Sequence, residues 1–291
     1  GDKMGFPVFP LNWLNSEGET YHGYREDGYF PEAFVNLLAM LGWNPGTEQE
    51  MFSMQELIDT FSLDKVSKSG AKFNPDKAKW YNKEYLRLRS DEDLAEALIP
   101  ILKEHGITIV DEPVVADFKS HTFSKDYVLG VVALCKERAT FVADFWTIAS
   151  YLFISPCEFE AFGVKAGAAV EQKPADNRRA PDPRAKVFDD TLTAPFLAKD
   201  ADKFWKPECY EPAMKVVEFV KNFEGEWNKP GIEAAIEEFI KSNEWPMGKV
   251  MNCTRLCLAG ASSGLGIADI VTFIGKDEFE ARVKFAAERL A

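Results

Sequence analysis

A cluster of basic side chains between residues 64 and 89 has the chemistry to bind phosphate groups. This window holds eight Lys and Arg residues but only three acidic ones. In a helix, Lys79, Lys83 and Arg87 would lie one above another, and Lys72 would precede the helix start. Such a stripe can follow a nucleic-acid backbone. An ordinary solvated helix face would explain the same residues, but the local positive excess in a chain of net charge −13 favours RNA.

A glycine-rich segment near the C-terminus offers a second kind of chemistry. Gly260-Ala-Ser-Ser-Gly264-Leu-Gly266 copies the dinucleotide-binding loop of short-chain dehydrogenases. That loop requires a preceding strand and a βαβ unit after it. Here only 25 residues follow, they read as two helices, and no Tyr-x-x-x-Lys pair is among them. We therefore reject an oxidoreductase and expect a glycine turn between helices.

The chain offers no convincing catalytic or metal-binding set. Lys65-Val-Ser-Lys-Ser69 is similar to the KMSKS loop of class I aminoacyl-tRNA synthetases, but His22, His105 and His121 lie in no matching second motif. The five cysteines are scattered and form no CxxC pair, so we expect reduced thiols and no metal site. We predict no catalytic residue in this chain.

The elements that position these residues are expected to be mainly α-helical. Pro31 and Gly42 mark a nearly all-apolar helix that should be buried. Further helix starts are marked by the capping box at Ser53, by Asn74-Pro75 and by Ser90, and Gly106 should end the third of these helices. The remaining helices are expected at 124–136, 140–153, 211–223, 231–242, 248–258 and 276–290. Residues 107–121 read as an irregular boundary, and a minor β element is expected before residue 30.

Length and composition suit a chain of two or three domains. With 46% hydrophobic residues, 23 Phe and 7 Trp, the 291 residues can bury sizeable cores. No apolar run is long enough to span a membrane, and no secretory signal is recognised, so we expect a cytoplasmic protein. Residues 165–190 are rich in proline and charge and read as a surface insertion.

The literal sequence also resembles a known family. The string from Gly23 to Gly46 is similar to the segment that follows the ATP-binding loop of bacterial glutamyl-tRNA synthetases. In that family the loop is followed by Gly-Asp, as at Gly1-Asp2 here. The resemblance implies the C-terminal part of such an enzyme, without its catalytic Rossmann domain.

The family's functional residues map onto a few positions of this chain. Thr254–Gly260 and Gly264–Ile267 resemble its anticodon-reading segment, and Lys136–Thr140 resembles the opening of its anticodon-binding helices. The implied anticodon contacts are Arg255, Gly264, Leu265, Gly266, Ile267 and Arg138. Since Gly264 and Leu265 stand where the family commonly has Thr-Pro, position 264 could use only backbone or shape recognition.

The resemblance implies a stem-contact domain at 1–115 and an all-α anticodon-binding domain of two helical bundles. The first bundle would span 116–208, including the insertion, and the second 209–291. The expected partner is tRNA-Glu, and we expect a monomer. The chain itself should need no cofactor, whereas the parent enzyme would use ATP and Mg²⁺ to glutamylate tRNA. The alternative is a helical protein-interaction scaffold with no nucleic-acid role.

Overall fold

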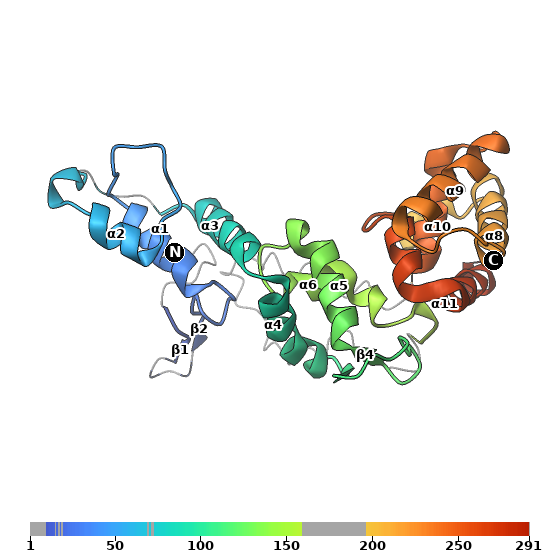
Figure 1. The fold of residues 1–291 in the computed structure, drawn as a ribbon, viewed down its shortest axis with the longest axis horizontal. Helices are drawn as coiled ribbons and strands as arrows, with labels where there is room; N and C mark the ends of the chain where they lie inside the picture. The colour runs from blue at the N-terminus through green and yellow to red at the C-terminus, as the bar shows by residue number, and fades with distance from the viewer. Residues whose placement is uncertain are drawn as a thin grey trace. The chain divides into compact units, whose positions relative to one another are not determined.

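The computed structural model describes residues 10–14, 16, 18, 20–68, 70, 73–158 and 196–290, and the chain is mainly α-helical (Figure 1). The described residues form two compact units. The first consists of residues up to Pro100 together with Cys135–Phe145, and the second of Ile101–Leu134, residues 146–158 and residues 196–290. The insertion predicted at 165–190 lies outside the described residues, and the predicted three-part domain division stays a prediction.

The first unit opens with a small sheet and continues with helices whose ends follow the sequence signals. Its elements are β1 (Trp13–Leu14), β2 (Thr20–Tyr21), α1 (Pro31–Met40), α2 (Met54–Thr60), η2 (Leu63–Lys65), α3 (Pro75–Leu88) and the greater part of α4 (Asp91–Glu104). The capping box at Ser53 is formed, and the Asn74 side chain caps α3. Gly42 adopts a left-handed conformation just after α1, with φ of 93°. The minor β element predicted before residue 30 is confirmed as the antiparallel pair β1–β2.

The prediction that α1 is buried on nearly all sides is wrong. Leu38 and Leu41 are 48% and 37% exposed, whereas the polar residue Asn36 is completely buried. The Asn36 carboxamide accepts the Phe52 N–H at 2.8 Å and donates to the Glu50 carbonyl at 3.0 Å. These bonds compensate its desolvation, so α1 turns Asn36 inward and leaves one apolar edge to solvent.

A second buried amide, Asn82 on α3, joins three segments of the first unit. Its Oδ1 accepts the Phe30 N–H at 2.8 Å, and its Nδ2 donates to the Thr140 carbonyl at 2.7 Å. The side chain is fully buried. Asn82 therefore ties the entry of α1 and the segment around Thr140 to the middle of α3.

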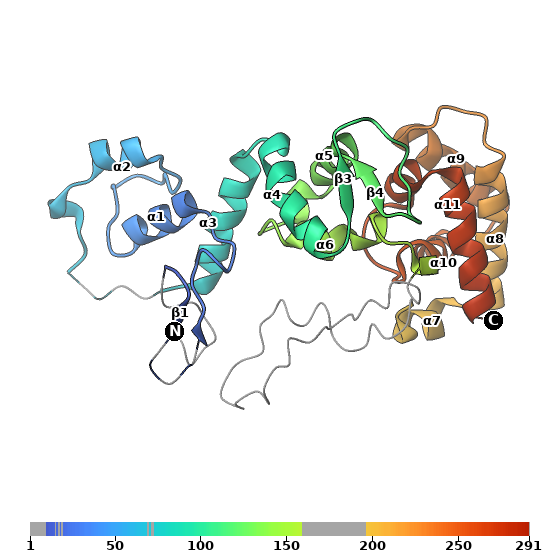
Figure 2. The ribbon, with the colours of Figure 1, turned by 90° about the horizontal axis from the view of Figure 1, so that it is seen from below.

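The second unit is built mostly from helices packed along α11 (Figure 2). Its elements are β3 (Thr108–Val110), β4 (Thr122–Ser124), α5 (Lys125–Cys135), α6 (Asp144–Ala149, which starts in the first unit), η4 (Ser150–Leu152), η5 (Pro156–Glu158), α7 (Ala198–Phe204), α8 (Pro207–Lys221), α9 (Lys229–Ser242), α10 (Met247–Ala259) and α11 (Ile267–Leu290). Helix α11 packs against α8, α9 and α10. Gly275 has φ of 79° and interrupts α11, which agrees with the two helices expected after the glycine turn.

Two expectations for the second unit need correction. Residues 107–121 were expected to be irregular, but Thr108–Val110 pairs in parallel with Thr122–Ser124. The helix expected at 140–153 is split into the short α6 and η4. Both differences arise from pairing and packing that have no local sequence signal, since a three-residue strand shows no clear alternation.

Asn82→Leu should destabilise the first unit by about 2–4 kcal/mol, because it leaves the Phe30 N–H and the Thr140 carbonyl buried without partners. Thermal unfolding and hydrogen exchange of the α1 and α3 amides measure the loss. Asn222→Leu, at the exposed end of α8, is the matched control and should have a much smaller effect. Equal stabilities of the two variants would contradict the bridging role of Asn82.

Candidate nucleic-acid interface

The glycine segment forms a turn between α10 and α11, which we call the glycine turn (residues 260–266). Gly260 ends α10 in a left-handed conformation with φ of 74°, and Gly264 has φ of 135°. Both values lie where glycine is strongly favoured. The segment that precedes the turn is a helix rather than a strand, which fits the rejection of a dinucleotide-binding loop.

Arg255 holds the carbonyl side of the glycine turn. Its Nε donates to the Leu265 carbonyl at 2.9 Å, and its Nη1 donates to the Ser262 carbonyl at 2.8 Å. Nη1 also bonds the Asn252 side chain at 3.1 Å. The guanidinium of Arg255 thus holds two carbonyls of the turn. An effect of Arg255 on ligand recognition would therefore act through the shape of the turn.

Three residues that the sequence analysis did not single out hold the other side of the turn. The Leu265 N–H donates to the Tyr151 hydroxyl at 3.2 Å, and the Ser262 N–H donates to the Asp200 carboxylate at 2.7 Å. The Leu197 N–H donates to the Gly260 carbonyl at 2.8 Å. Tyr151, Asp200 and Leu197 are distant in sequence from the turn, so no local motif could have revealed them.

The exposed part of the glycine turn is its tip, Ser263–Gly264. Leu265 and Ile267 are each 1% exposed, so their side chains belong to the core and only their backbone could contact a ligand. Gly266 is half-buried, and a Cβ at this position would lie 2.8 Å from the Asp269 carboxylate. That carboxylate forms an ion pair with Lys229 at 2.7 Å. Ser263 is the exposed hydroxyl that the sequence analysis overlooked, although it lies within the glycine-rich string.

The predicted basic stripe is only partly available for a ligand. Lys72 lies outside the described residues. Arg87 forms ion pairs with Glu84 at 2.8 Å and with Glu137 at 2.7 Å, so its charge is locally compensated. Lys79 and Lys83 are half-buried on α3 and form no ion pair with any other described residue. They are the members of the stripe best able to meet a phosphate.

The aromatic residues interleaved with the stripe serve the core of the first unit. Tyr81 is 1% exposed, and Phe73, Trp80 and Tyr85 pack against the cluster around it. The Tyr85 hydroxyl donates to the Phe52 carbonyl at 2.8 Å. These rings therefore stabilise the helix that carries the lysines, and they do not form an open stacking surface.

Arg138 lies on the short helix η3 (Lys136–Arg138), in the first unit, and is exposed. The adjacent Lys136 is held by the Asp91 carboxylate at 2.8 Å and the Arg89 carbonyl at 2.6 Å. The structure thus places Arg138 on η3, in a different compact unit from the glycine turn.

Two cysteines of α10 and one lysine of the KMSKS-like string have partners within the fold. Cys253 and Cys257 are buried free thiols, and a hydrogen bond between them, together with burial, raises the pKa of Cys257. A thiol with a raised pKa is a poor nucleophile. No group of side chains in the described part of the chain could hold a metal ion, and none of its helices is long and apolar enough to cross a membrane. In the KMSKS-like string, the Lys65 ammonium donates to the Pro45 carbonyl at 2.6 Å.

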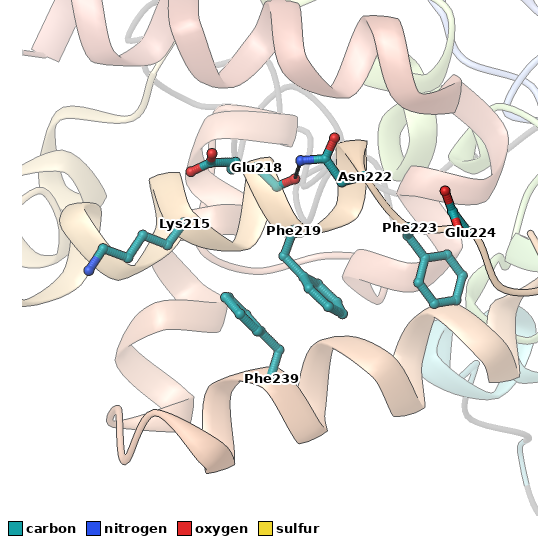
Figure 3. A pocket seen from close by; sticks show the side chains of 7 residues that line it. All are labelled: Lys215, Glu218, Phe219, Asn222, Phe223, Glu224 and Phe239. Carbon is teal, nitrogen blue, oxygen red and sulfur yellow. Dashed lines mark hydrogen bonds between the residues drawn. The ribbon is translucent and has the colours of Figure 1, made fainter.

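An aromatic groove of about 640 Å³ lies between α8 and α9 (Figure 3). Phe219 and Phe239 stack there with ring centroids 4.3 Å apart. The remaining lining residues are Lys215, Glu218, Asn222, Phe223 and Glu224. Two carboxylates beside one ammonium make this groove unfavourable for a phosphate backbone.

Gly264→Ala should destabilise the second unit by about 1–3 kcal/mol, because φ of 135° is strained for alanine. The new Cβ would also lie 3.2 Å from the Tyr151 hydroxyl oxygen. Thermal unfolding measures the change. Gly248→Ala is the matched control, since this glycine lies in α10 and its added Cβ would meet no atom within 4 Å. A loss no larger than that of the control would contradict the described turn geometry.

Comparisons with known proteins agree with these features. The family model of the anticodon binding domain matches residues 183–287, which include the glycine turn and the helices around it. The model of the catalytic domain of class I tRNA synthetases for E and Q matches residues 16–80. That match covers β2, α1, α2 and the start of α3, and the described residues there form no Rossmann unit.

Similar sequences and structures extend over the whole chain. The glutamate–tRNA ligase of Flavobacterium johnsoniae is 37% identical over 290 residues, and that of Bacteroides thetaiotaomicron is 34% identical. Each match covers 100% of this chain and 47% of the relative. A crystal structure of the Elizabethkingia meningosepticum glutamate tRNA ligase, in complex with its amino acid, aligns with a TM-score of 0.75 at 34% identity. That alignment covers 100% of this chain and 48% of the ligase chain. The chain spans about half the length of the relatives it matches, and it is similar to the C-terminal part of bacterial glutamate–tRNA ligases.

Proposed function

We propose that this chain is the tRNA-binding part of a glutamate–tRNA ligase and recognises the body and the anticodon of tRNA-Glu. The observation that carries the proposal is the match of the anticodon-binding family model to the residues that build the glycine turn. Unpaired anticodon bases present their Watson–Crick edges, and an exposed turn with little side-chain bulk lets backbone groups approach them closely. The tip Ser263–Gly264 is such a surface.

In this proposal different residues contact the tRNA backbone and the anticodon. The first unit contains the proposed stem-contact region, 1–115, as far as Pro100. It contacts the tRNA backbone through Lys79 and Lys83. Contacts to phosphate position a nucleic acid, whereas contacts to bases determine specificity. Arg138 and the glycine turn, with Arg255 shaping it, would read the anticodon. We propose that the chain acts as a monomer in the cytoplasm.

The described residues do not fit the ATP and Mg²⁺ of the parent reaction. They contain neither a βαβ phosphate-binding unit nor a cluster of metal-ligating side chains. We propose that ATP-dependent glutamylation of tRNA belongs to the part of the ligase that this chain does not span, since the chain covers 47% of its relatives, and that this chain supplies tRNA binding.

A helical protein-interaction scaffold is the second candidate function. The observation in its favour is the groove of Phe219, Phe223 and Phe239, whose acidic neighbours suit a protein partner better than RNA. A scaffold predicts no salt-sensitive binding of tRNA, whereas the ligase proposal requires it.

Filter binding of tRNA-Glu and of the same tRNA with a swapped anticodon, over a salt series, tests the proposed function. Tighter binding of tRNA-Glu is expected. Lys79→Ala and Lys83→Ala should weaken the binding of both tRNAs by the same factor. Each should lower the magnitude of the slope of log binding constant against log salt concentration by about 1, the value for one lost phosphate contact.

Lys241→Ala is the matched control, because Lys241 is an exposed lysine on α9 paired with Glu237. It should leave the salt slope unchanged. Equal and negligible affinity for the two tRNAs would exclude the ligase proposal and favour the scaffold.

Arg255→Ala should reduce the discrimination between the two anticodons more than either lysine variant does. The alanine removes two hydrogen bonds that fix the turn carbonyls of Leu265 and Ser262, so the exposed tip loses its defined shape. The ratio of the two dissociation constants is the measurement. A ratio equal to that of the Lys79→Ala variant would count against a recognition role for this arginine.

A further inference from the structure

A tyrosine from a distant segment lies directly against the glycine turn. Tyr151, on η4, accepts the Leu265 N–H on its hydroxyl oxygen at 3.2 Å. A Cβ at position 264 would lie 3.2 Å from the same oxygen, closer than an ordinary van der Waals contact. The absence of a side chain at Gly264 is therefore what allows the phenol to approach the turn backbone.

The backbone of Tyr151 is itself anchored by a buried arginine. The Nη1 of Arg282 donates to the Tyr151 carbonyl and to the Leu258 carbonyl, each at 2.8 Å. Its Nε bonds the Glu278 carboxylate at 2.7 Å, and the side chain is completely buried. One guanidinium on α11 thus joins η4 to the last turn of α10, immediately before the glycine turn.

We propose that Tyr151 is a positioning residue for base recognition, which fixes the amide side of the glycine turn while Arg255 fixes the carbonyl side. The inference rests on the proposed function of the turn. Recognition by backbone groups depends on the direction of each N–H and C=O, because a hydrogen bond weakens steeply when its angle departs from linearity.

The physical reason lies in the flexibility of the turn itself. Glycine populates a wide range of backbone conformations, so Gly264 and Gly266 do not by themselves define one shape. Arg282 anchors the backbone carbonyl of Tyr151. The Tyr151 hydroxyl then accepts the Leu265 N–H and selects the conformation in which this N–H points inward. The exposed Ser263–Gly264 tip is then presented to the ligand in a single arrangement.

Tyr151→Phe tests this assignment, since it removes the hydroxyl and keeps the ring. In the full 291-residue chain, the ratio of affinities for tRNA-Glu and the anticodon-swapped tRNA should fall by about three- to tenfold, as expected for loss of one net hydrogen bond. Affinity for the swapped tRNA should change little. Thermal unfolding verifies that the variant is folded.

Tyr127→Phe is the matched control. The Tyr127 hydroxyl also bonds η4, at the Leu152 carbonyl (2.6 Å), but it does not reach the glycine turn. This variant should keep the full affinity ratio. An equal loss in both variants, or an unchanged ratio for Tyr151→Phe while the wild-type chain discriminates, would overturn the positioning role alone. A wild-type chain that does not discriminate between the tRNAs would overturn the proposed function with it.

Discussion

The second unit depends on the burial of the Arg282 guanidinium. A charged group removed from water is tolerated only where it is paired and hydrogen-bonded. Arg282 is paired with Glu278 through Nε and bonds the carbonyls of Tyr151 and Leu258 through Nη1, whereas its buried Nη2 has no hydrogen-bond partner among the described residues. Glu278 lies on α11 with Arg282, whereas the two carbonyls belong to η4 and α10, so a shift of η4 or α10 would leave a buried N–H of the guanidinium without its acceptor. The same constraint that stabilises the unit therefore fixes both the start of the glycine turn and the tyrosine beside it.

The conformation of the glycine turn depends on partners that its composition does not reveal. Three glycines in seven residues suggest a flexible loop, yet backbone groups of the turn bond several partners outside it, among them Arg255 (twice), Tyr151, Asp200 and Leu197. Because these N–H and C=O groups bond partners within the protein, the exposed part of the turn is Ser263–Gly264. The glycines permit the conformation, and the surrounding side chains select it.

In the first unit, some basic side chains are compensated by carboxylates and others are not. Arg87 is compensated by two carboxylates, and Lys136 by Asp91. Lys79 and Lys83 stay outside this network on a helix whose position is set by the buried Asn82 and Tyr81. The net charge of −13 opposes binding to any polyanion at long range. Such a chain favours a few well-placed contacts over a broad basic patch.

Local signals in the sequence determined several helix starts and ends and which family the chain resembles. The capping box at Ser53, the Asn74 cap and the glycines at 42, 106 and 260 act within one helical turn, so one stretch of sequence contains all the necessary information. Only the tertiary structure decided that Asn36 is buried while Leu38 is exposed, and that β3 pairs with β4. It also decided that Arg87 is neutralised by Glu137, and that Tyr151 supports Leu265. Each of these outcomes depends on a partner that the folded chain brings from a distant position, because burial and hydrogen bonding are settled by the whole packed unit.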